Sequence, residues 1–319
     1  MATTTAVKRV SVGARYRSMG RMARRENLWG WILSSPWWLG FLIFTLLPML
    51  ASIYFSLTKW DILTPPQWVG LQNYKYMFSK SGDPIVLHSF KITTIYALVS
   101  VPLRLVLGFS IALLMNQNIR GIFIFRTIYY LPAVLAGVAV AMLWRWVFNS
   151  EFGLINLLIW TLFKVKGPAW LVDPDWALWA LIIMSMWDVG SPMLIYLAGL
   201  QGIPTDLYEA AMVDGANAWR RFWAVTIPMI SPVLFFNLVM GIIDALQTFT
   251  QAFILTEGGP NNATMFAILY MYLNAFRWFK MGFASAIAWI LFIYILILTL
   301  IVFRSSALWV HYEGEVKGR

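Results

Sequence analysis

Apolar residues occur along this chain in long runs that do not alternate with polar positions. A run of about 20 residues is long enough to cross the hydrocarbon core of a bilayer as a helix, whereas a membrane β-strand would show a period of two. The pattern therefore predicts an all-α, polytopic membrane protein with about six transmembrane helices. The expected spans are 37–57, 92–114, 122–147, 176–200, 232–255 and 282–303.

A further apolar run at residues 265–276 is too short to cross a bilayer. We expect it to lie at the membrane interface or to lead into the last span, and seven spans are the alternative. Prolines and glycines interrupt several of the predicted spans. Such interruptions indicate either ordinary kinks in a packed bundle or helix breaks that line a cavity.

Composition supports a membrane protein. Of 319 residues, 60% are hydrophobic and 12% are charged, whereas a soluble domain is about half apolar and about a quarter charged. The chain has no cysteine, which excludes disulfides and thiolate metal sites.

The net charge of +10 does not indicate nucleic-acid binding, because much of it precedes the first apolar run. Basic residues next to a span stay on the cytoplasmic side during insertion, and an even number of spans returns the chain to that side. We therefore expect both termini to be cytoplasmic and membrane lipid to be a partner; a cleaved signal peptide is the disfavoured alternative. The N-terminal basic residues are Lys8, Arg9, Arg15, Arg17, Arg21, Arg24 and Arg25.

These patterns divide the chain into four predicted segments. They are a basic cytoplasmic N-terminal tail at 1–30, the first transmembrane helix with an extracytoplasmic loop at 31–90, a helical core at 91–305, and a cytoplasmic C-terminal tail at 306–319.

The core contains one long polar segment, residues 201–232, which we expect on the cytoplasmic face. Thr205 or Asp206 can cap a first helix, and Glu209 stands where a capping box places its acid. Gly215 can adopt the left-handed conformation that ends such a helix. The segment predicts a helix–turn–helix, and an amphipathic interfacial linker is the alternative.

The second helix of this segment is predicted from residue 218 to about residue 225, and it carries Arg220 and Arg221. We expect it to end before Pro228, because proline lacks the N–H of the helical hydrogen bond and its ring clashes with the preceding turn.

Three short motifs in this segment resemble the EAA loop of binding-protein-dependent ABC importer permeases. They are Glu209-Ala210-Ala211, Asp214-Gly215-Ala216 and Ile227-Pro228. The chain also resembles the carbohydrate branch of this family, with its maltose-type and glycerol-3-phosphate-type permeases, over about residues 36–303. The passages 69–74, 255–260 and 282–286 carry that further similarity.

The resemblance implies a MetI-like core of the type I importer permeases, in a bacterial-type cytoplasmic (inner) membrane. It implies an ABC ATPase dimer, a second homologous permease subunit and an extracytoplasmic solute-binding protein as partners. The solute would be a small molecule such as a sugar, polyol or sugar phosphate. The residues implied in coupling to the ATPase are Glu209, Ala210, Ala211, Asp214, Gly215, Arg220, Arg221 and Pro228.

The sequence has no GxxxxGK[ST] phosphate-binding loop, no HExxH motif, and only two histidines, which lie far apart. We therefore expect no enzyme activity, no metal and no cofactor in this chain, with ATP bound by the partner subunit.

Polar residues within the apolar runs indicate a solute pathway, because such side chains are costly against lipid. Asp244, Gln247, Thr248 and Gln251 have the spacing of one helical face. By the resemblance, the predicted substrate pathway comprises Asp188, Ser191, Asp244, Gln247 and Thr248.

Two alternatives remain for these polar residues. They can form ordinary hydrogen bonds between helices. In an ion-coupled secondary transporter, Asp188 and Asp244 would be ion sites, but that hypothesis leaves the segment 201–232 unexplained.

Overall fold

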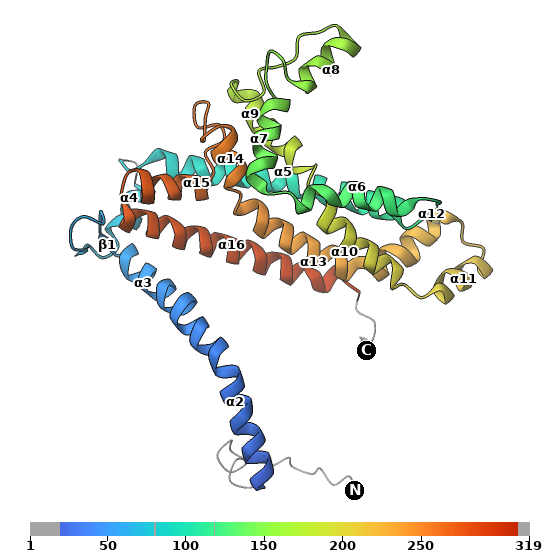
Figure 1. The fold of residues 1–319 in the computed structure, drawn as a ribbon, viewed down its shortest axis with the longest axis horizontal. Helices are drawn as coiled ribbons and strands as arrows, with labels where there is room; N and C mark the ends of the chain where they lie inside the picture. Colours follow the sequence, from blue (N-terminus) through green and yellow to red (C-terminus); the bar gives the residue numbers. More distant parts are fainter. Residues whose placement is uncertain (1–19, 80, 118, 312–319) are drawn as a thin grey trace. The chain divides into compact units, whose positions relative to one another are not determined.

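The computed structural model describes residues 20–79, 81–117 and 119–311 (Figure 1). Two compact units make up the chain, Met1–Tyr54 and Phe55–Arg319. Of the predicted terminal tails, residues 1–19 and 312–319 lie outside the described residues, and so do Lys8, Arg9, Arg15 and Arg17.

The first unit contains nearly all of a long helical stretch that runs from Arg21 to Ser56. It comprises α2 (Arg21–Phe41), a π-helical turn η1 (Leu42–Leu46) and α3 (Leu47–Ser56). The helix begins at Arg21 rather than near residue 37 because the basic segment is rich in good helix formers. Pro36 is tolerated inside α2 because the Ser35 hydroxyl donates to the Ile32 carbonyl oxygen (2.7 Å), which the proline nitrogen leaves without an N–H partner.

The second unit begins with a small hairpin that the hydropathy pattern does not predict. Strands β1 (Thr58–Lys59) and β2 (Gln67–Trp68) pair antiparallel, and α4 (Gln72–Phe78) follows. The Asn73 amide donates to the carbonyl oxygens of Ser56 and Thr58, at 2.8 and 2.9 Å. Gly282 lies against the hairpin, where an added Cβ would be 2.0 Å from the Thr58 oxygen.

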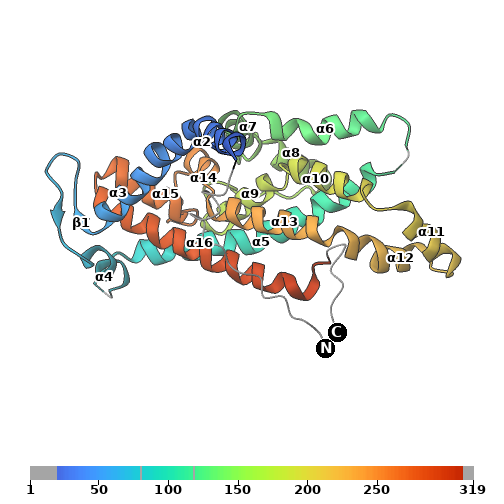
Figure 2. The same ribbon diagram turned by 90° about the horizontal axis from the view of Figure 1, so that it is seen from below.

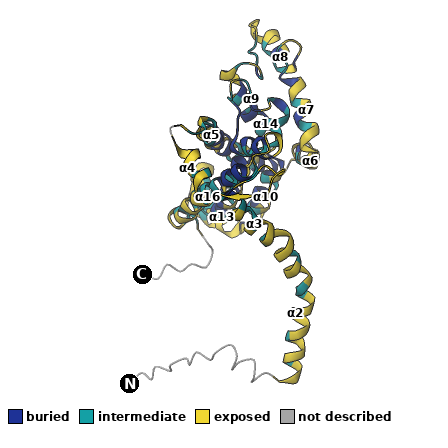
Figure 3. Cartoon of the chain, turned by 90° about the vertical axis from the view of Figure 1, so that its left-hand side faces the viewer, coloured by how far each residue is buried: buried dark blue, intermediate teal, exposed yellow. Residues whose placement is uncertain are grey.

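The rest of the second unit is a helical bundle built around α5 (Figure 2), which α9, α10, α13 and α15 contact. Buried positions concentrate at the centre of this unit (Figure 3). The elements are α5 (Pro84–Met115), α6 (Ile122–Val134), α7 (Gly137–Val147), α8 (Leu154–Phe163), α9 (Pro174–Ser185), α10 (Gly190–Gln201), α11 (Thr205–Val213), α12 (Ala218–Arg221), η2 (Phe222–Thr226), α13 (Ile227–Leu246), α14 (Thr250–Leu255), α15 (Ala267–Tyr272), η3 (Leu273–Arg277) and α16 (Met281–Trp309).

The described residues contain four helical stretches long and apolar enough to cross a membrane, or up to six if two bent pairs each count as one span. The prediction of about six spans agrees with the second count. The pairs are α6 with α7, bent by 101°, and α9 with α10, bent by 43°. The predicted span at 122–147 is therefore a bent pair of helices, not one straight helix.

The α6–α7 break lies at a two-residue extended segment. Leu135 and Ala136 are extended, with ψ of 144° and 127°. Gly190, the first residue of α10, sits so close to α6 that an added Cβ would be 2.6 Å from the Tyr129 carbonyl oxygen. Tertiary packing thus holds α6 against α10, while α7 turns away to contact α14.

The short apolar run at 265–276 forms α15 and most of the π-helical turn η3. It leads into the last span, as predicted, and it packs inside the protein, because Leu269 and Tyr270 are buried and α15 contacts α5 and α16. The last helix continues to Trp309, past the predicted end at 303. Just beyond it, the His311 N–H donates to the Ser231 hydroxyl on α13 (2.8 Å).

Candidate functional site: a charged hollow and an exposed helical hairpin

A hollow of about 330 Å³ lies among α5, α10 and α13. Most of its wall is apolar, so its few polar side chains decide what it can bind. It is lined by Val101, Arg104, Leu105, Asp188, Ser191, Pro192, Ile195, Phe236, Asn237, Met240, Gly241 and Asp244.

Two polar residues reach the hollow because the fourth predicted span is broken. Residues 186–189 leave the helical conformation between α9 and α10, and Asp188 lies in this break. Ser191 stands in the first turn of α10. Both side chains are exposed. A helix break at membrane depth is tolerated only inside protein or beside a water-filled cavity, so the cavity interpretation is favoured over ordinary kinks here.

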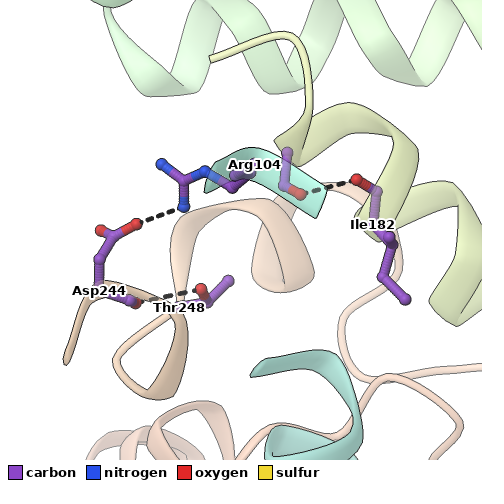
Figure 4. A network of polar contacts seen from close by, with 5 residues as sticks. Arg104, Ile182, Asp244 and Thr248 are labelled. Atoms are coloured by element: carbon purple, nitrogen blue, oxygen red, sulfur yellow. Dashed lines mark hydrogen bonds and ion pairs between the residues drawn. The ribbon is translucent and has the colours of Figure 1, made fainter. Parts of the chain in front are cut away.

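An ion pair crosses the hollow (Figure 4). The Arg104 guanidinium on α5 donates from Nη1 to Oδ2 of Asp244 on α13 at 2.8 Å. The Arg104 side chain is 16% exposed, but that of Asp244 is 66% exposed. Asp188 also lies close enough to interact electrostatically with Arg104. The hollow therefore contains one largely buried cation, Arg104, and two exposed carboxylates, Asp188 and Asp244.

The predicted polar stripe on the fifth span is not a single helical face. Helix α13 ends at Leu246 and α14 begins at Thr250, because Phe249 adopts φ −128° and ψ −60°. Thr248 is 9% exposed, and its hydroxyl donates to the Asp244 carbonyl oxygen at 3.3 Å. Gln247 instead lines a separate hollow of about 360 Å³ among apolar residues of α15 and α16.

Of the five residues predicted for the pathway, Asp188, Ser191 and Asp244 therefore lie in one hollow, while Gln247 and Thr248 do not line it. Arg104 and Asn237 line it as well; both are polar residues within predicted spans, but the five-residue assignment did not include them. A lone arginine in one apolar run and an aspartate in another could have indicated this pair, because such charges seek each other inside a membrane.

The segment 201–232 forms the predicted helix–turn–helix. Helix α11 carries the Glu209-Ala210-Ala211 motif. Gly215, with φ of +75°, makes the turn that ends this helix. None of the described residues of α11 is buried; Glu209 and Ala210 are exposed. The predicted capping box is absent from this described segment, because Pro204 holds the N-cap position and has no side-chain acceptor. Asn217 caps α12 instead, accepting from the Arg220 N–H at 2.8 Å.

The prediction that the second helix ends before Pro228 is wrong. Helix α12 continues through the π-helical turn η2 into α13 without a break, and Pro228 is the second residue of α13. In η2 the Ile227 N–H bonds to the Phe222 carbonyl oxygen, five residues back. The wider turn lies directly before the proline, where its ring would otherwise crowd an α-helical turn.

One hydrogen bond ties the two arms of the hairpin together. The hydroxyls of Tyr208 on α11 and Thr226 in η2 lie 3.0 Å apart. This bond joins α11 to the turn directly before α13, the helix that carries Asp244.

Broken apolar helices around an ionisable hollow are typical of membrane transporters, in which such breaks line a solute path. The hairpin adds a helix, α11, with no buried residue. The fold and the hollow together define a permease-type membrane protein.

Comparison with known proteins makes this class specific. Residues 104–310 match the family of binding-protein-dependent transport system inner membrane components, and the chain belongs to this family. It is a membrane-spanning permease of an ABC transporter. It is similar to "Probable ABC transporter permease protein YesP" of Bacillus subtilis, at 45% identity over 95% of this chain and 98% of that protein. It is also 33% identical to the trehalose/maltose transport system permease protein MalF of Thermococcus litoralis, over 89% of this chain and 95% of that protein.

The fold is also found in solved structures. A chain of a bacterial ABC transporter involved in the import of the polysaccharide alginate matches with a TM-score of 0.75 at 23% identity, covering 90% of this chain and 96% of that chain. The family and this fold favour the ABC permease over the ion-coupled secondary transporter. Within the described residues, no group of three or more His, Cys, Asp or Glu side chains is placed to hold a metal ion.

Proposed function

We propose that this chain is one of two permease subunits of an importer for a sugar or a related polyol or sugar phosphate. The relatives support the solute class, because they include permeases named for trehalose/maltose and for multiple sugars. The hollow supports it chemically, since Arg104, Asn237 and the two carboxylates offer both donors and acceptors to a hydroxylated solute.

The other components follow from the family. An ABC ATPase dimer binds ATP, so this chain itself holds no cofactor and catalyses no reaction. A second homologous permease completes the pathway, and an extracytoplasmic solute-binding protein delivers the solute. One solved relative is described as a complex with a periplasmic protein that binds an alginate pentasaccharide. The chain lies in the cytoplasmic membrane with both termini in the cytoplasm.

Helix α11 is the proposed contact with the ATPase. The observation that carries this proposal is the exposure of α11 beside the left-handed Gly215. The small side chains of Ala210 and Ala211 permit close approach, and Glu209 and Asp214 offer charges to the partner. Arg220, Arg221 and Pro228 lie beyond the Gly215 turn, on α12 and α13, so the proposed ATPase contact does not include them.

The test combines assembly with transport. The chain is co-expressed with its partner subunits, and Ala210→Trp is compared with Leu63→Trp, an exposed substitution in the β1–β2 connection. We expect Ala210→Trp to reduce co-purification of the ATPase and uptake of labelled sugars by at least about tenfold, the equivalent of about 1.4 kcal/mol. Leu63→Trp should not affect co-purification. Normal assembly and uptake with Ala210→Trp would refute the contact.

A further inference from the structure

The start of the fifth span carries a second exposed surface, separate from α11. It comprises Trp219, Arg220, Arg221 and Trp223, and we call it the Trp–Arg surface. Trp219 and Trp223 are 69% and 53% exposed, although tryptophan is usually well buried. Their rings pack edge to face at 5.7 Å, so the two indoles form one apolar ridge.

The opposite side of the same segment is fixed to the protein. The Phe222 ring contacts Phe109 of α5 at 6.2 Å, and Thr226 is buried and bonded to Tyr208. This packing determines which side of the segment faces outward. The indoles of Trp219 and Trp223 are therefore held on the outside by the fold.

The two arginines give this surface an uncompensated positive charge. Arg220 is exposed and Arg221 is half-buried, and neither forms an ion pair with another residue of the described chain. The sequence from Gly215 to the residue before Asp244 contains no aspartate or glutamate. A partner for this surface should supply negative charge.

Helix length places the surface at a particular depth. Helix α13 has 20 residues, so it is about 30 Å long and matches the hydrocarbon core. When the core is taken to coincide with α13, Trp223 lies about 6 Å, and the arginines about 10 Å, before its start along the helix axis. The headgroup layer is about 5–8 Å thick on each side, and arginine side chains reach toward it along their apolar stems.

We propose that the Trp–Arg surface binds the phosphodiester headgroups of anionic phospholipids in the cytoplasmic leaflet. The arginines pair with the phosphates, and the indoles lie between the headgroups and the acyl chains. Because α12 continues into α13 and Thr226 is bonded to α11, this contact sets the height of α11 above the membrane. The cytoplasmic position of the surface rests on the proposed function.

The test uses a fluorescent reporter beside the surface. The chain has no cysteine, so Ala224→Cys, at an exposed position in η2, provides a unique labelling site. The full chain is labelled, assembled with its partner subunits, and placed in nanodiscs with brominated phosphatidylglycerol or brominated phosphatidylcholine. Each arginine should enrich the anionic lipid about fivefold near the label. We therefore expect much stronger quenching by brominated phosphatidylglycerol, and loss of this preference in molar salt.

Arg220→Gln with Arg221→Gln should abolish the preference but keep quenching by both lipids. Arg304→Gln, at an exposed arginine of α16, is the matched control and should keep the preference. Millimolar inorganic phosphate should have no effect; if it removed the preference, the ligand would be free phosphate. Absence of quenching by either lipid would show that a polypeptide covers the surface. Equal quenching by both lipids, or a preference that survives the double substitution, would also overturn the proposal.

Both leaflets of a nanodisc have the same composition, so the result does not depend on which way the chain crosses. Sugar uptake by the same assembly in proteoliposomes tests the proposed function separately. A transporter that imports sugar without a lipid preference would refute only the lipid contact.

Discussion

The two side chains of the ion pair differ in exposure, since Arg104 is largely buried and Asp244 is exposed. Replacing Asp244 tests whether stability depends on this difference. Asp244→Ala would leave the Arg104 guanidinium, 16% exposed, without its partner. Losing one member of a buried pair costs about 3–5 kcal/mol, whereas a fully exposed pair contributes about 0.2–1 kcal/mol. Because Asp244 itself is 66% exposed, we expect an intermediate loss of stability of about 1–3 kcal/mol.

Arg104→Met should behave differently. It removes the sheltered charge, keeps most of the side-chain volume, and leaves only an exposed carboxylate, so stability should change little. In the Arg104→Met background, Asp244→Ala should then cost almost nothing, because no buried charge remains to be stranded. Both single variants should lower solute uptake, since each changes the polar groups of the hollow.

The assay compares unfolding midpoints of the wild-type, two single-variant and double-variant transporters, purified in the same detergent. If Asp244→Ala destabilised the protein equally with and without Arg104, the two side chains would not be energetically coupled. The ion pair would then be incidental to the hollow, and the argument from exposure would be wrong.

Four further predictions use other contacts. Gly215→Asp should reduce ATPase co-purification, because φ of +75° is costly for a side chain and α11 would be reoriented; an unchanged yield would refute this. Gly282→Ala should lower the unfolding midpoint, because its Cβ would meet the Thr58 oxygen at 2.0 Å, while Gly40→Ala, with no atom within 4 Å, should not. Gln247→Ala should keep near-wild-type uptake, since Gln247 lies outside the charged hollow; a large loss would return it to the pathway. Cysteines at Ser81 and Asn261 should react with an impermeant thiol reagent in right-side-out vesicles and one at Ala218 should not, and the reverse pattern would invert the topology.

The sequence was most informative where one local property determines the structure. Continuous apolar runs identified all six regions that form spans or bent pairs. Gly215 identified the turn between α11 and α12, because few other residues adopt its conformation. The motifs beside it identified the family.

Sequence was less informative where distant contacts decide the structure. The break after α6 depends on close packing by Gly190, more than fifty residues away in the sequence. Pro228 was expected to end a helix, but the π-helical turn before it relieves the clash. Asp244 and Gln247 have helical spacing, but α13 ends at Leu246, between them, and they line different hollows.

The bend between α6 and α7 also has a consequence for biogenesis. With 13 and 11 residues, the two helices are about 20 and 17 Å long, and neither alone is long enough to cross the hydrocarbon core. Residues 122–147 precede α10 in the chain and are therefore synthesised before it. The close contact between Gly190 and Tyr129 can therefore form only after α10 has been synthesised. A substitution at Gly190 would yield a chain with correct topology and incorrect packing, a defect that quality control must detect after membrane integration.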